Sequence, residues 1–254
     1  MLRFGAALAG LLAAAAAVAA EEKAVCNPAF IGSAPVRAAI DGRTLALADG
    51  REVRLAGIEV PQGDAAKAAL AAAVDGREVA LAPLDPKTDR YGRISALINR
   101  LGDRQPVQMA LLRQGLARVS ARVGDAACAA DFLRAERAAR AAGLGLWSDP
   151  AYLVQKAENP GEVSMQRGRF TLVEGKVLSV RENGATIYVN FGRRWSEDFT
   201  VTVLKRNERR FSAAGVDLRK MTGRHVRVRG LVEERGGPWI EAARPEQIEI
   251  AERD

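Results

Sequence analysis

Two short segments, each with an arginine beside a predicted strand, constrain the fold of this chain more than any other feature. The first, Val53–Gln62 (VRLAGIEVPQ), begins with the alternation of apolar and polar residues that is typical of a half-buried strand. The second, Asp89–Arg93 (DRYGR), is a turn-forming loop between two apolar runs of strand type. Together they indicate a β-rich unit in the first half of the chain, with Arg54 and Arg93 on or next to its strands.

The neighbouring residues predict helices that pack on a short barrel. The last of these helices ends at Gly143, as a C-cap would require. A small barrel with packed helices is the arrangement of the five-stranded OB-type fold, so we expect a mainly β architecture with α-helices, of α+β class. The predicted strands are residues 44–47, 52–55, 78–84 and 93–98, and the predicted helices are residues 65–74, 106–114 and 126–142.

Five sequence strings, in the right order, resemble the thermonuclease (staphylococcal nuclease-like, SNase-like) family between about residues 38 and 147. The resemblance implies that this half of the chain folds as an SNase-like OB-fold barrel, in which arginines from two segments bracket a phosphodiester. The strings are DGRTL at 41–45, where the family has DGDTL; the two arginine segments; VQMALLRQGLARV at 107–119; and LRAE at 133–136 followed by GLGLW at 143–147.

By this resemblance, Arg54 and Arg93 form the phosphate clamp, and Tyr91 is a further residue of the anion-binding site. Phosphodiester hydrolysis places additional negative charge on the non-bridging oxygens, and positioned guanidinium groups stabilise that charge. Arginine suits this role because its planar fork donates two parallel hydrogen bonds and stays charged at any relevant pH. Both clamp positions are therefore filled.

The position of the family's general base is filled by Gln62, whose amide cannot accept a proton at neutral pH. A positioned base contributes typically ~10²–10⁴ in rate. Asp64 lies two residues further on, but a displaced carboxylate rarely reproduces a geometry that must hold within about 0.5 Å. Two tyrosines that contact the nucleotide in the best-known members fall on Ala121 and Val123. We therefore expect a catalytically inactive homologue of a calcium-dependent nuclease.

The family's metal site is altered as well. Calcium prefers several oxygen ligands, with carboxylates supplying most of the charge. One family aspartate falls on Arg43, whose positive charge repels a cation, and the second falls on Glu59. Asp41 is the other candidate ligand. We expect no cofactor, and Ca²⁺ only if Glu59, Asp41 or Asp64 forms a rearranged site.

What the resemblance leaves at this site is a group of three arginines, Arg43, Arg54 and Arg93, with one or two carboxylates. Three guanidinium groups make an anion-binding site. The alternative is that Glu59 and Asp41 neutralise the arginines and leave a structural salt-bridge network. Both interpretations stay open at this point.

The N-terminus has the form of a secretory signal peptide. Arg3 is the charged region, residues 4–17 are apolar, and the small-residue cleavage site ends at Ala20, so residues 1–20 form the predicted signal. The apolar run is short and rich in alanine for a membrane span. We expect a secreted or periplasmic protein with no transmembrane segment after signal removal; an uncleaved anchor is the alternative.

The chain has two cysteines, Cys26 and Cys128, in a compartment that permits oxidation. A disulfide between them would tie an N-terminal arm, residues 21–37, to the helical part of the first unit. Pro28 and Pro35 discourage regular structure in this arm. Two free buried thiols are the alternative.

The second half of the chain predicts another small barrel. After a first domain at residues 38–150 and a linker at 151–168, the pattern of residues 169–251 becomes mainly strand. Asn183-Gly184 is a strong hairpin turn, and a helical insert at 207–214 separates the third strand from the fourth. This order of elements indicates a second, OB-like β-barrel.

The charge balance favours a polyanionic partner. The chain has 38 basic and 31 acidic residues. In the second barrel, Arg227 and Arg229 share one strand face, where we expect solvent to cover them. Trp195, Tyr188 and Trp239 are candidates for base stacking, although we expect Tyr188 and Trp239 to close the core and only Trp195 to lie on the surface.

These observations favour an exported thermonuclease-like protein with a degenerate active site. It would bind nucleic acid or another polyanion through its arginine cluster. One alternative is an active metal-dependent phosphodiesterase or endonuclease with a rearranged site. The second is a scaffold with a protein partner in the cell envelope. Metal-dependent cleavage, binding that weakens steeply with salt, and a salt-resistant protein partner distinguish the three.

Overall fold

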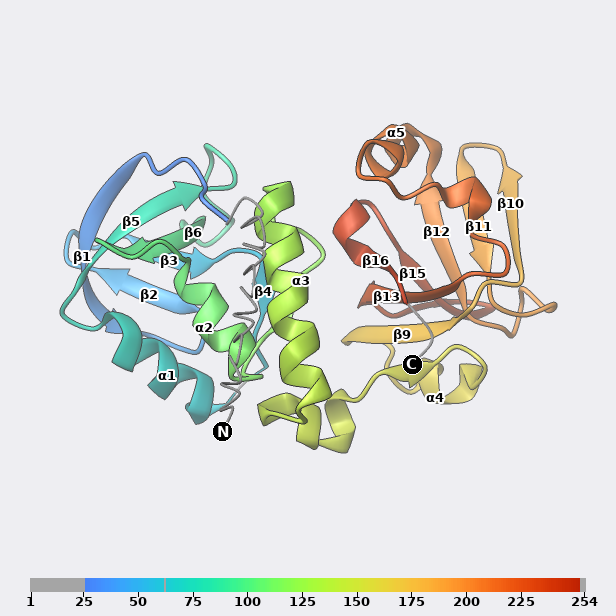
Figure 1. The fold of residues 1–254 in the computed structure, drawn as a ribbon, viewed down its shortest axis with the longest axis horizontal. Coiled ribbons are helices and arrows are strands. Elements are labelled where there is room, and N and C mark those ends of the chain that lie inside the picture. Colours follow the sequence, from blue (N-terminus) through green and yellow to red (C-terminus); the bar gives the residue numbers. More distant parts are fainter. Residues whose placement is uncertain (1–25, 62, 252–254) are drawn as a thin grey trace, which may run out of the picture.

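The computed structural model describes residues 26–61 and 63–251, which form two β-rich units side by side (Figure 1). The long helix α3 (Ala126–Ala141) lies between them (Figure 1). The predicted signal peptide and the general-base position, Gln62, lie outside the described residues. Within the described ranges, no helix combines the length and the apolar character that a membrane span requires.

The first unit is a closed barrel of five strands in the order β1-β2-β3-β6-β5. Only the pair β3 and β6 is parallel, with Val53 opposite Ile94. The alternation that predicts β3 is visible in its burial, because Val53 and Leu55 are buried and Glu52 is exposed. The predicted five-stranded barrel is confirmed. Its strands are β1 (Gly32–Ala39), β2 (Thr44–Leu47), β3 (Glu52–Leu55), β5 (Glu78–Pro83) and β6 (Ile94–Arg100).

The expectation of an irregular arm through residue 37 is wrong for its last part, because β1 begins at Gly32. Residues 32–35 of β1 pair with β5, whereas residues 36–39 pair with β2. Pro35 lies where the strand passes from one partner to the other, so its missing N–H does not interrupt a continuous ladder. Its carbonyl accepts a hydrogen bond from the backbone N–H of Ala48 (2.9 Å).

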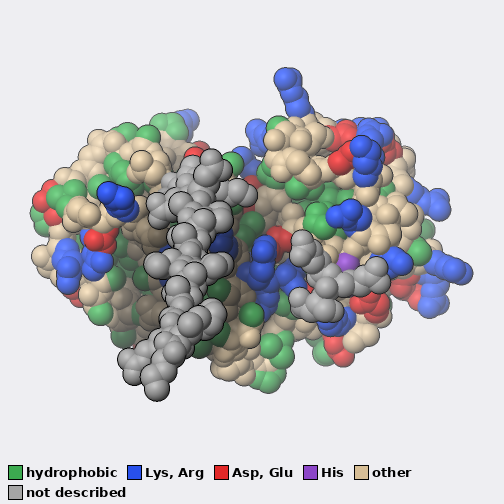
Figure 2. Space-filling view, viewed as in Figure 1, with side chains coloured by type: hydrophobic (Ala, Val, Ile, Leu, Met, Phe, Trp, Pro, Cys, Tyr) green, Lys and Arg blue, Asp and Glu red, His purple; other side chains and the backbone are tan. Residues whose placement is uncertain are grey.

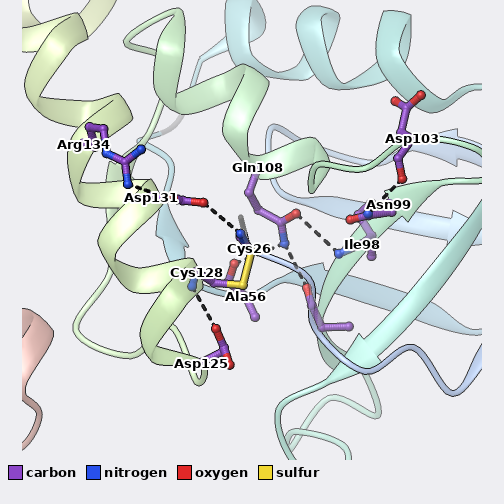
Figure 3. The surroundings of a disulfide bond; sticks show 11 residues. Cys26, Ala56, Ile98, Asn99, Asp103, Gln108, Asp125, Cys128, Asp131 and Arg134 are labelled. Carbon is purple, nitrogen blue, oxygen red and sulfur yellow. Dashed lines mark hydrogen bonds and ion pairs between the residues drawn. A yellow bond between two sulfur atoms is a disulfide. The ribbon is translucent and has the colours of Figure 1, made fainter. Parts of the chain in front are cut away.

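The helices of this unit bury an apolar face against the barrel. On α1, Leu70 and Val74 are one turn apart and fully buried. On α2, the fully buried Gln108 donates from Nε2 to the carbonyl oxygens of Ala56 (3.2 Å) and Ala96 (3.1 Å) (Figure 3). These bonds join the helix to the residue after β3 and to β6. The helices are α1 (Asp64–Val74), α2 (Val107–Arg113) and α3, and a short two-stranded ladder joins β4 (Ile58–Glu59) to β7 (Arg118–Val119).

A disulfide joins Cys26 to Cys128 on α3, as the two-cysteine argument predicts (Figure 3). Asp125 caps the helix by accepting a hydrogen bond from the backbone N–H of Cys128 (2.8 Å). One turn later, Asp131 accepts a hydrogen bond from the backbone N–H of Cys26 (2.8 Å). The same carboxylate forms an ion pair with Arg134 (2.6 Å). The start of the described chain is therefore fixed to α3 by a covalent bond and a hydrogen bond.

The second unit has two sheets, in the orders β10-β11-β12-β15-β14 and β16-β13-β9-β8. Two residues separate β9 from β10, and one separates β13 from β14, so each pair is one bent strand shared by both sheets. Counted this way, the first strand pairs with the second and fourth, and the third pairs in parallel with the fifth. The first barrel has the same order, so the second unit is OB-like. Its elements are β8 (Gln155–Lys156), α4 (Pro160–Ser164), β9 (Phe170–Lys176), β10 (Ser179–Asn183), β11 (Thr186–Asn190), β12 (Thr200–Leu204), α5 (Lys205–Ala213), β13 (His225–Leu231), β14 (Glu233–Arg235), β15 (Gly237–Glu241) and β16 (Ile248–Ile250); short 3₁₀ turns lie at Gly145–Ser148, Pro150–Tyr152, Leu218–Lys220 and Pro245–Gln247.

The residues between the two barrels are part of the packed structure. β8 pairs in parallel with β9, and Ala157 and Val163 are buried in the core of the second unit. Trp147, the closing tryptophan of the nuclease-like strings, packs with Ala139 of α3 and Leu172 of β9. The domain boundaries expected at residues 150 and 168 stay predictions.

A buried group of charges joins the two units. Arg229 on β13 is 1 % exposed and contacts the fully buried carboxylate of Glu136 on α3 (2.5 Å) and Glu249 on β16. It also donates to the carbonyl of Val119 on β7 (3.2 Å). The expectation that solvent covers Arg229 is therefore wrong, and the reason is that its partner comes from a helix 93 residues earlier in the chain.

We expect loss of the disulfide to destabilise the protein strongly. The bond closes a loop with a sequence separation of 102 residues, and removal of a native disulfide typically costs about 2–5 kcal/mol. Urea unfolding of the double variant Cys26→Ser, Cys128→Ser should show a lower midpoint, with an equal or larger m-value because the unfolded chain without the bond is less compact. A midpoint equal to that of the oxidised wild type would contradict the structural role of the bond.

We expect Arg229→Ala to cost roughly 3–5 kcal/mol at neutral pH, because it removes the fully buried guanidinium that pairs with two buried carboxylates and leaves them only longer contacts to Arg137 and Arg140. Burial opposes ionisation of Glu249, but Arg229 outweighs it and lowers the pKa of this carboxyl. In the wild type the lowered pKa of Glu249 stabilises the folded protein at pH values above the pKa that this carboxyl has in the unfolded chain. That stabilisation is lost as the pH falls through the pKa of Glu249 in the folded protein. The variant lacks that contribution, so its deficit should shrink towards about pH 4.

The matched control for this prediction is Arg137→Ala. Arg137 contacts the same Glu249 (3.3 Å), but its side chain is 62 % exposed, and such pairs contribute at most about 1 kcal/mol. Denaturant unfolding at neutral and acidic pH measures both variants. Equal costs for the two variants would mean that Arg229 does not hold the interface as described.

Candidate functional site

Three arginines meet at one end of the first barrel because of the strand register. Arg54 lies on β3, where its neighbours across the ladder are Thr44 on β2 and Ser95 on β6. Arg43 immediately precedes Thr44, and Arg93 lies two residues before Ser95. The structure therefore places Arg43 and Arg93 on either side of Arg54, and both are close enough to lower the pKa of Arg54.

Arg43 forms an ion pair with Glu59, the residue at one of the family's metal-ligand positions. The distance from Nη1 to Oε2 is 2.5 Å, and both side chains are partly buried. The loop that carries Arg43 approaches α1 closely, since a Cβ on Gly42 would lie 2.8 Å from the side chains of Val60 and Ala66. In the same loop, Asp41 accepts a hydrogen bond from the backbone N–H of Arg43 (2.7 Å).

Arg93 is held by an ion pair within its own loop. Its Nη2 lies 2.8 Å from Asp89 Oδ2, and the other oxygen of this carboxylate accepts hydrogen bonds from the backbone N–H groups of Tyr91 (2.9 Å) and Arg93 (3.0 Å). The side-chain hydrogen bond from Arg93, followed by these backbone bonds, lowers the pKa of Asp89 to about 2. Gly92 completes the turn with a φ of 79°. Tyr91 is 63 % exposed, and the guanidinium carbons of Arg90 and Arg93 lie 4.8 and 4.9 Å from the centre of its ring.

Arg54 differs from its two neighbours because no carboxylate among the described residues forms an ion pair with it. Its pKa is lowered first by partial burial and then by the positive charge of Arg43. Arginine stays protonated in spite of such a shift. Burial and the neighbouring guanidinium groups both disfavour the charge on Arg54, and an anion bound beside it would favour that charge.

The residues present do not fit the family's calcium site. Among the described residues there is no group of three or more Asp, Glu, His or Cys side chains that could hold a metal. Glu59 is already paired with the guanidinium of Arg43, and Asp41 is exposed and engaged with backbone. Asp64, the alternative candidate for the general base, is the exposed first residue of α1.

A fourth arginine belongs to this region and is missed by the sequence argument. Arg118 on β7 lies opposite Glu59 in the β4–β7 ladder and is only 8 % exposed. Its guanidinium carbon is 5.4 Å from the ring centres of both Tyr152 and Phe170. Burial lowers its pKa, while Glu136 and Glu59 oppose the shift. In the sequence, Arg118 lies within the string at 107–119, and the resemblance assigns that string to a helix and a turn. Nothing in the string indicates that this arginine reaches the site.

Val123, one of the two positions that the resemblance assigns to nucleotide-contacting tyrosines, lies against the second unit. The backbone N–H of Val123 donates to Glu246 (3.0 Å), from the turn before β16. Arg122, between the two positions, pairs with Asp85 of the first unit (2.7 Å). The second barrel thus lies close to the segment that would face a nucleotide in the family's arrangement.

The comparison with protein families agrees with this geometry. Residues 50–149 match the family model described as Staphylococcal nuclease homologue. Together with the closed five-stranded barrel, the match makes the first unit an SNase-like OB-fold domain, and so a nuclease-family domain. No curated protein matches the chain.

We expect the carboxyl of Asp89 to titrate near pH 2, because its pKa is held low by Arg93. In Arg93→Ala the midpoint should rise towards the ordinary value of about 3.9. The carboxyl carbon chemical shift, followed by NMR as the pH is lowered, measures both. The depressed pKa contributes stability above the unfolded pKa, and this contribution is lost as the pH falls through about 2. A wild-type midpoint near 3.9 would contradict the loop geometry.

Proposed function

We propose that this is an exported protein whose SNase-like domain binds nucleic acid, or a similar polyanion, without hydrolysing it. The observation that supports the proposal is the ion pair between Arg43 and Glu59, two positions to which the resemblance assigns the family's metal-binding carboxylates. A cation and a guanidinium compete for the same carboxylate and repel each other. The site therefore keeps phosphate-binding groups and lacks the groups that would activate water.

Three features support anion binding. Arg54 has no carboxylate partner among the described residues, and two further guanidinium groups flank it. The chain carries a formal net charge of +7 at neutral pH. Figure 2 shows lysine and arginine side chains over both units on the face drawn there, with several where the units meet.

The absence of hydrolysis is proposed from the chemistry of the altered positions. Gln62 stands where a carboxylate base is required, and an amide does not take a proton from water. The phosphate clamp alone stabilises charge but supplies no nucleophile. The alternative of a rearranged phosphodiesterase requires Glu59 to leave Arg43 or Asp64 to reach the site.

Export is proposed from the signal-like N-terminus together with the disulfide, which is a bond of oxidising compartments. The polyanion would then be met outside the cytoplasm. A protein partner in the envelope remains the competing proposal, and it predicts binding that survives moderate salt.

The first experiment measures hydrolysis and binding of a fluorescent single-stranded oligonucleotide by the disulfide-bonded protein. We expect no cleavage with Ca²⁺, with Mg²⁺ or with chelator, and binding that weakens steeply with salt. Arg54→Ala should weaken binding and reduce the salt slope, because one phosphate contact is lost. The matched control is Arg113→Ala, an exposed arginine on α2 with no ion pair in the described structure.

Two results would overturn this proposal. Cleavage that requires a divalent metal and disappears in Arg93→Ala would identify an active nuclease with a rearranged site. Binding that resists salt, or that Arg54→Ala and Arg113→Ala affect equally, would remove the arginine cluster as the polyanion site.

A second prediction concerns the lost chemistry. Cleavage should appear in the double variant Arg43→Asp, Gln62→Glu with added Ca²⁺, and in neither single variant, because both a ligand and a base must be restored. The same oligonucleotide assay measures it. Activity in either single variant would show that the assignment of these two positions is incomplete.

A further inference from the structure

A groove of about 990 Å³ lies on the outer face of the second barrel, over strands β10, β11, β12 and β15. Residues of β11 and β12 alternate: Ile187 and Val201 point into the core, whereas Tyr188 and Thr202 line the groove. In Figure 1, β10 and β11 lie on the side of the second unit away from α3. The groove is therefore separate from the arginine cluster of the first barrel.

The groove gathers half of the chain's scarce tyrosine and tryptophan residues. The chain has three of each, and one tyrosine and two tryptophans line this one surface: Tyr188, Trp195 and Trp239. Trp195 is 75 % exposed, as expected from its flanking charges. The expectation that Tyr188 closes the core is wrong, because its strand position alternates with the core residue Ile187. Trp239 is buried as expected, but its strand position alternates with the core residue Ile240, so it also lines the groove.

The floor of the groove offers hydrogen-bonding groups that lack a partner. Thr202 and Trp239 are each 8 % exposed, and no described residue bonds Thr202 Oγ1 or Trp239 Nε1. Buried polar atoms are normally hydrogen-bonded, so these two are positioned to meet a ligand. Beside them, Asn190 bridges three strands through Ser179 Oγ and Thr200 Oγ1, at 3.4 Å each.

The rim of the groove is positively charged. Arg181, Arg193 and Arg235 line it, and among the described residues none of the three forms an ion pair. The guanidinium carbon of Arg235 lies 4.7 Å from the centre of a ring of Trp239. Of the two carboxylates in the lining, Glu182 is paired with Lys205 (2.9 Å) and Arg219, which leaves Glu241 alone against three arginines.

We propose that this groove binds single-stranded nucleic acid. Aromatic rings accept bases by stacking, unpaired arginines contact phosphates, and the floor supplies donors and acceptors for base edges or sugars. A neutral sugar would carry no negative charge to pair with the three arginines. A duplex hides its base faces, so it could use only the rim. A single strand, with a negatively charged backbone and unpaired bases, fits the aromatic rings, the unpaired arginines and the polar floor together.

The test uses the disulfide-bonded protein with Arg54→Ala as background, so that binding at the first barrel is weakened. The probe is a fluorescent oligothymidine of about 12 nucleotides, within the roughly 4–16 nucleotides that one OB fold covers. In this background, Trp195→Ala should weaken binding by roughly 5- to 150-fold, the usual effect of losing one stacked base. Because Trp195 is exposed, the substitution should leave the fold intact.

Arg181→Ala should lower the salt slope of binding by about 0.7, the value for one phosphate contact on a single strand. The matched control is Arg209→Ala, an exposed arginine on α5 that does not line the groove, and it should leave affinity unchanged. Two competitors, a duplex of the same length and a sulfated glycan of similar charge, should displace the probe less well than unlabelled oligothymidine.

The inference is overturned if Trp195→Ala and Arg181→Ala bind the probe as the background does, if the Arg54→Ala background does not bind it at all, or if the sulfated glycan or the duplex is the better competitor. These results are distinguishable from failure of the proposed function. Loss of the Arg54 effect with a retained Trp195 effect would leave the groove as the binding site, and the converse would leave only the first barrel.

Discussion

The carboxylate of Glu136 is the interaction on which the arrangement of both barrels depends. It is fully buried on α3, accepts a hydrogen bond from the backbone N–H of Val119 (3.1 Å) and pairs with Arg229 of the second barrel. Val119 lies on β7, whose ladder with β4 carries Glu59. One buried charge therefore fixes the second barrel to α3 and, through β7, the strand that presents a residue of the candidate site. A buried carboxylate is costly unless it is fully paired, so the contact holds only when both units are in place.

At the candidate site the barrel keeps its strand register, and the balance of charge decides what the site can bind. Within the barrel, the main chain still brings Arg43, Arg54 and Arg93 together, because strand register determines their places. What differs is the balance of charge, since a guanidinium now pairs with Glu59. The salt-bridge interpretation is confirmed for Arg43, whose partner is Glu59, whereas Arg93 pairs with Asp89 and not with Asp41; the anion-site interpretation stays a prediction. Arg43 and Arg93 have carboxylate partners, in a salt-bridge arrangement, whereas Arg54 keeps a positive charge with no paired carboxylate among the described residues.

The sequence predicts what depends on local pattern and fails where a distant partner decides. Strand alternation and the family strings predict the first barrel, and two cysteines predict their bond. The sequence favours solvent around Arg229 because nothing near it in the chain indicates that Glu136 covers it. Tyr188 has the size and character of a core residue, but a one-residue change of register moves a strand residue to the other face, and its side chain lines the groove. Gln62 lies outside the described residues, so its assignment rests on the sequence alone.

A guanidinium with an internal carboxylate partner has little binding energy left for a ligand, and this distinction divides the arginines of the chain. Of the clustered arginines Arg43, Arg54 and Arg93, Arg54 alone lacks such a partner among the described residues, whereas three arginines on the rim of the groove lack one. If both proposals hold, neither site alone needs to bind tightly. The buried ion pairs of Arg229 keep the two barrels in one orientation, so a strand that reaches both sites meets the second at a high effective concentration. Binding strength would then depend on strand length, and the interface charges would influence affinity without contacting the ligand.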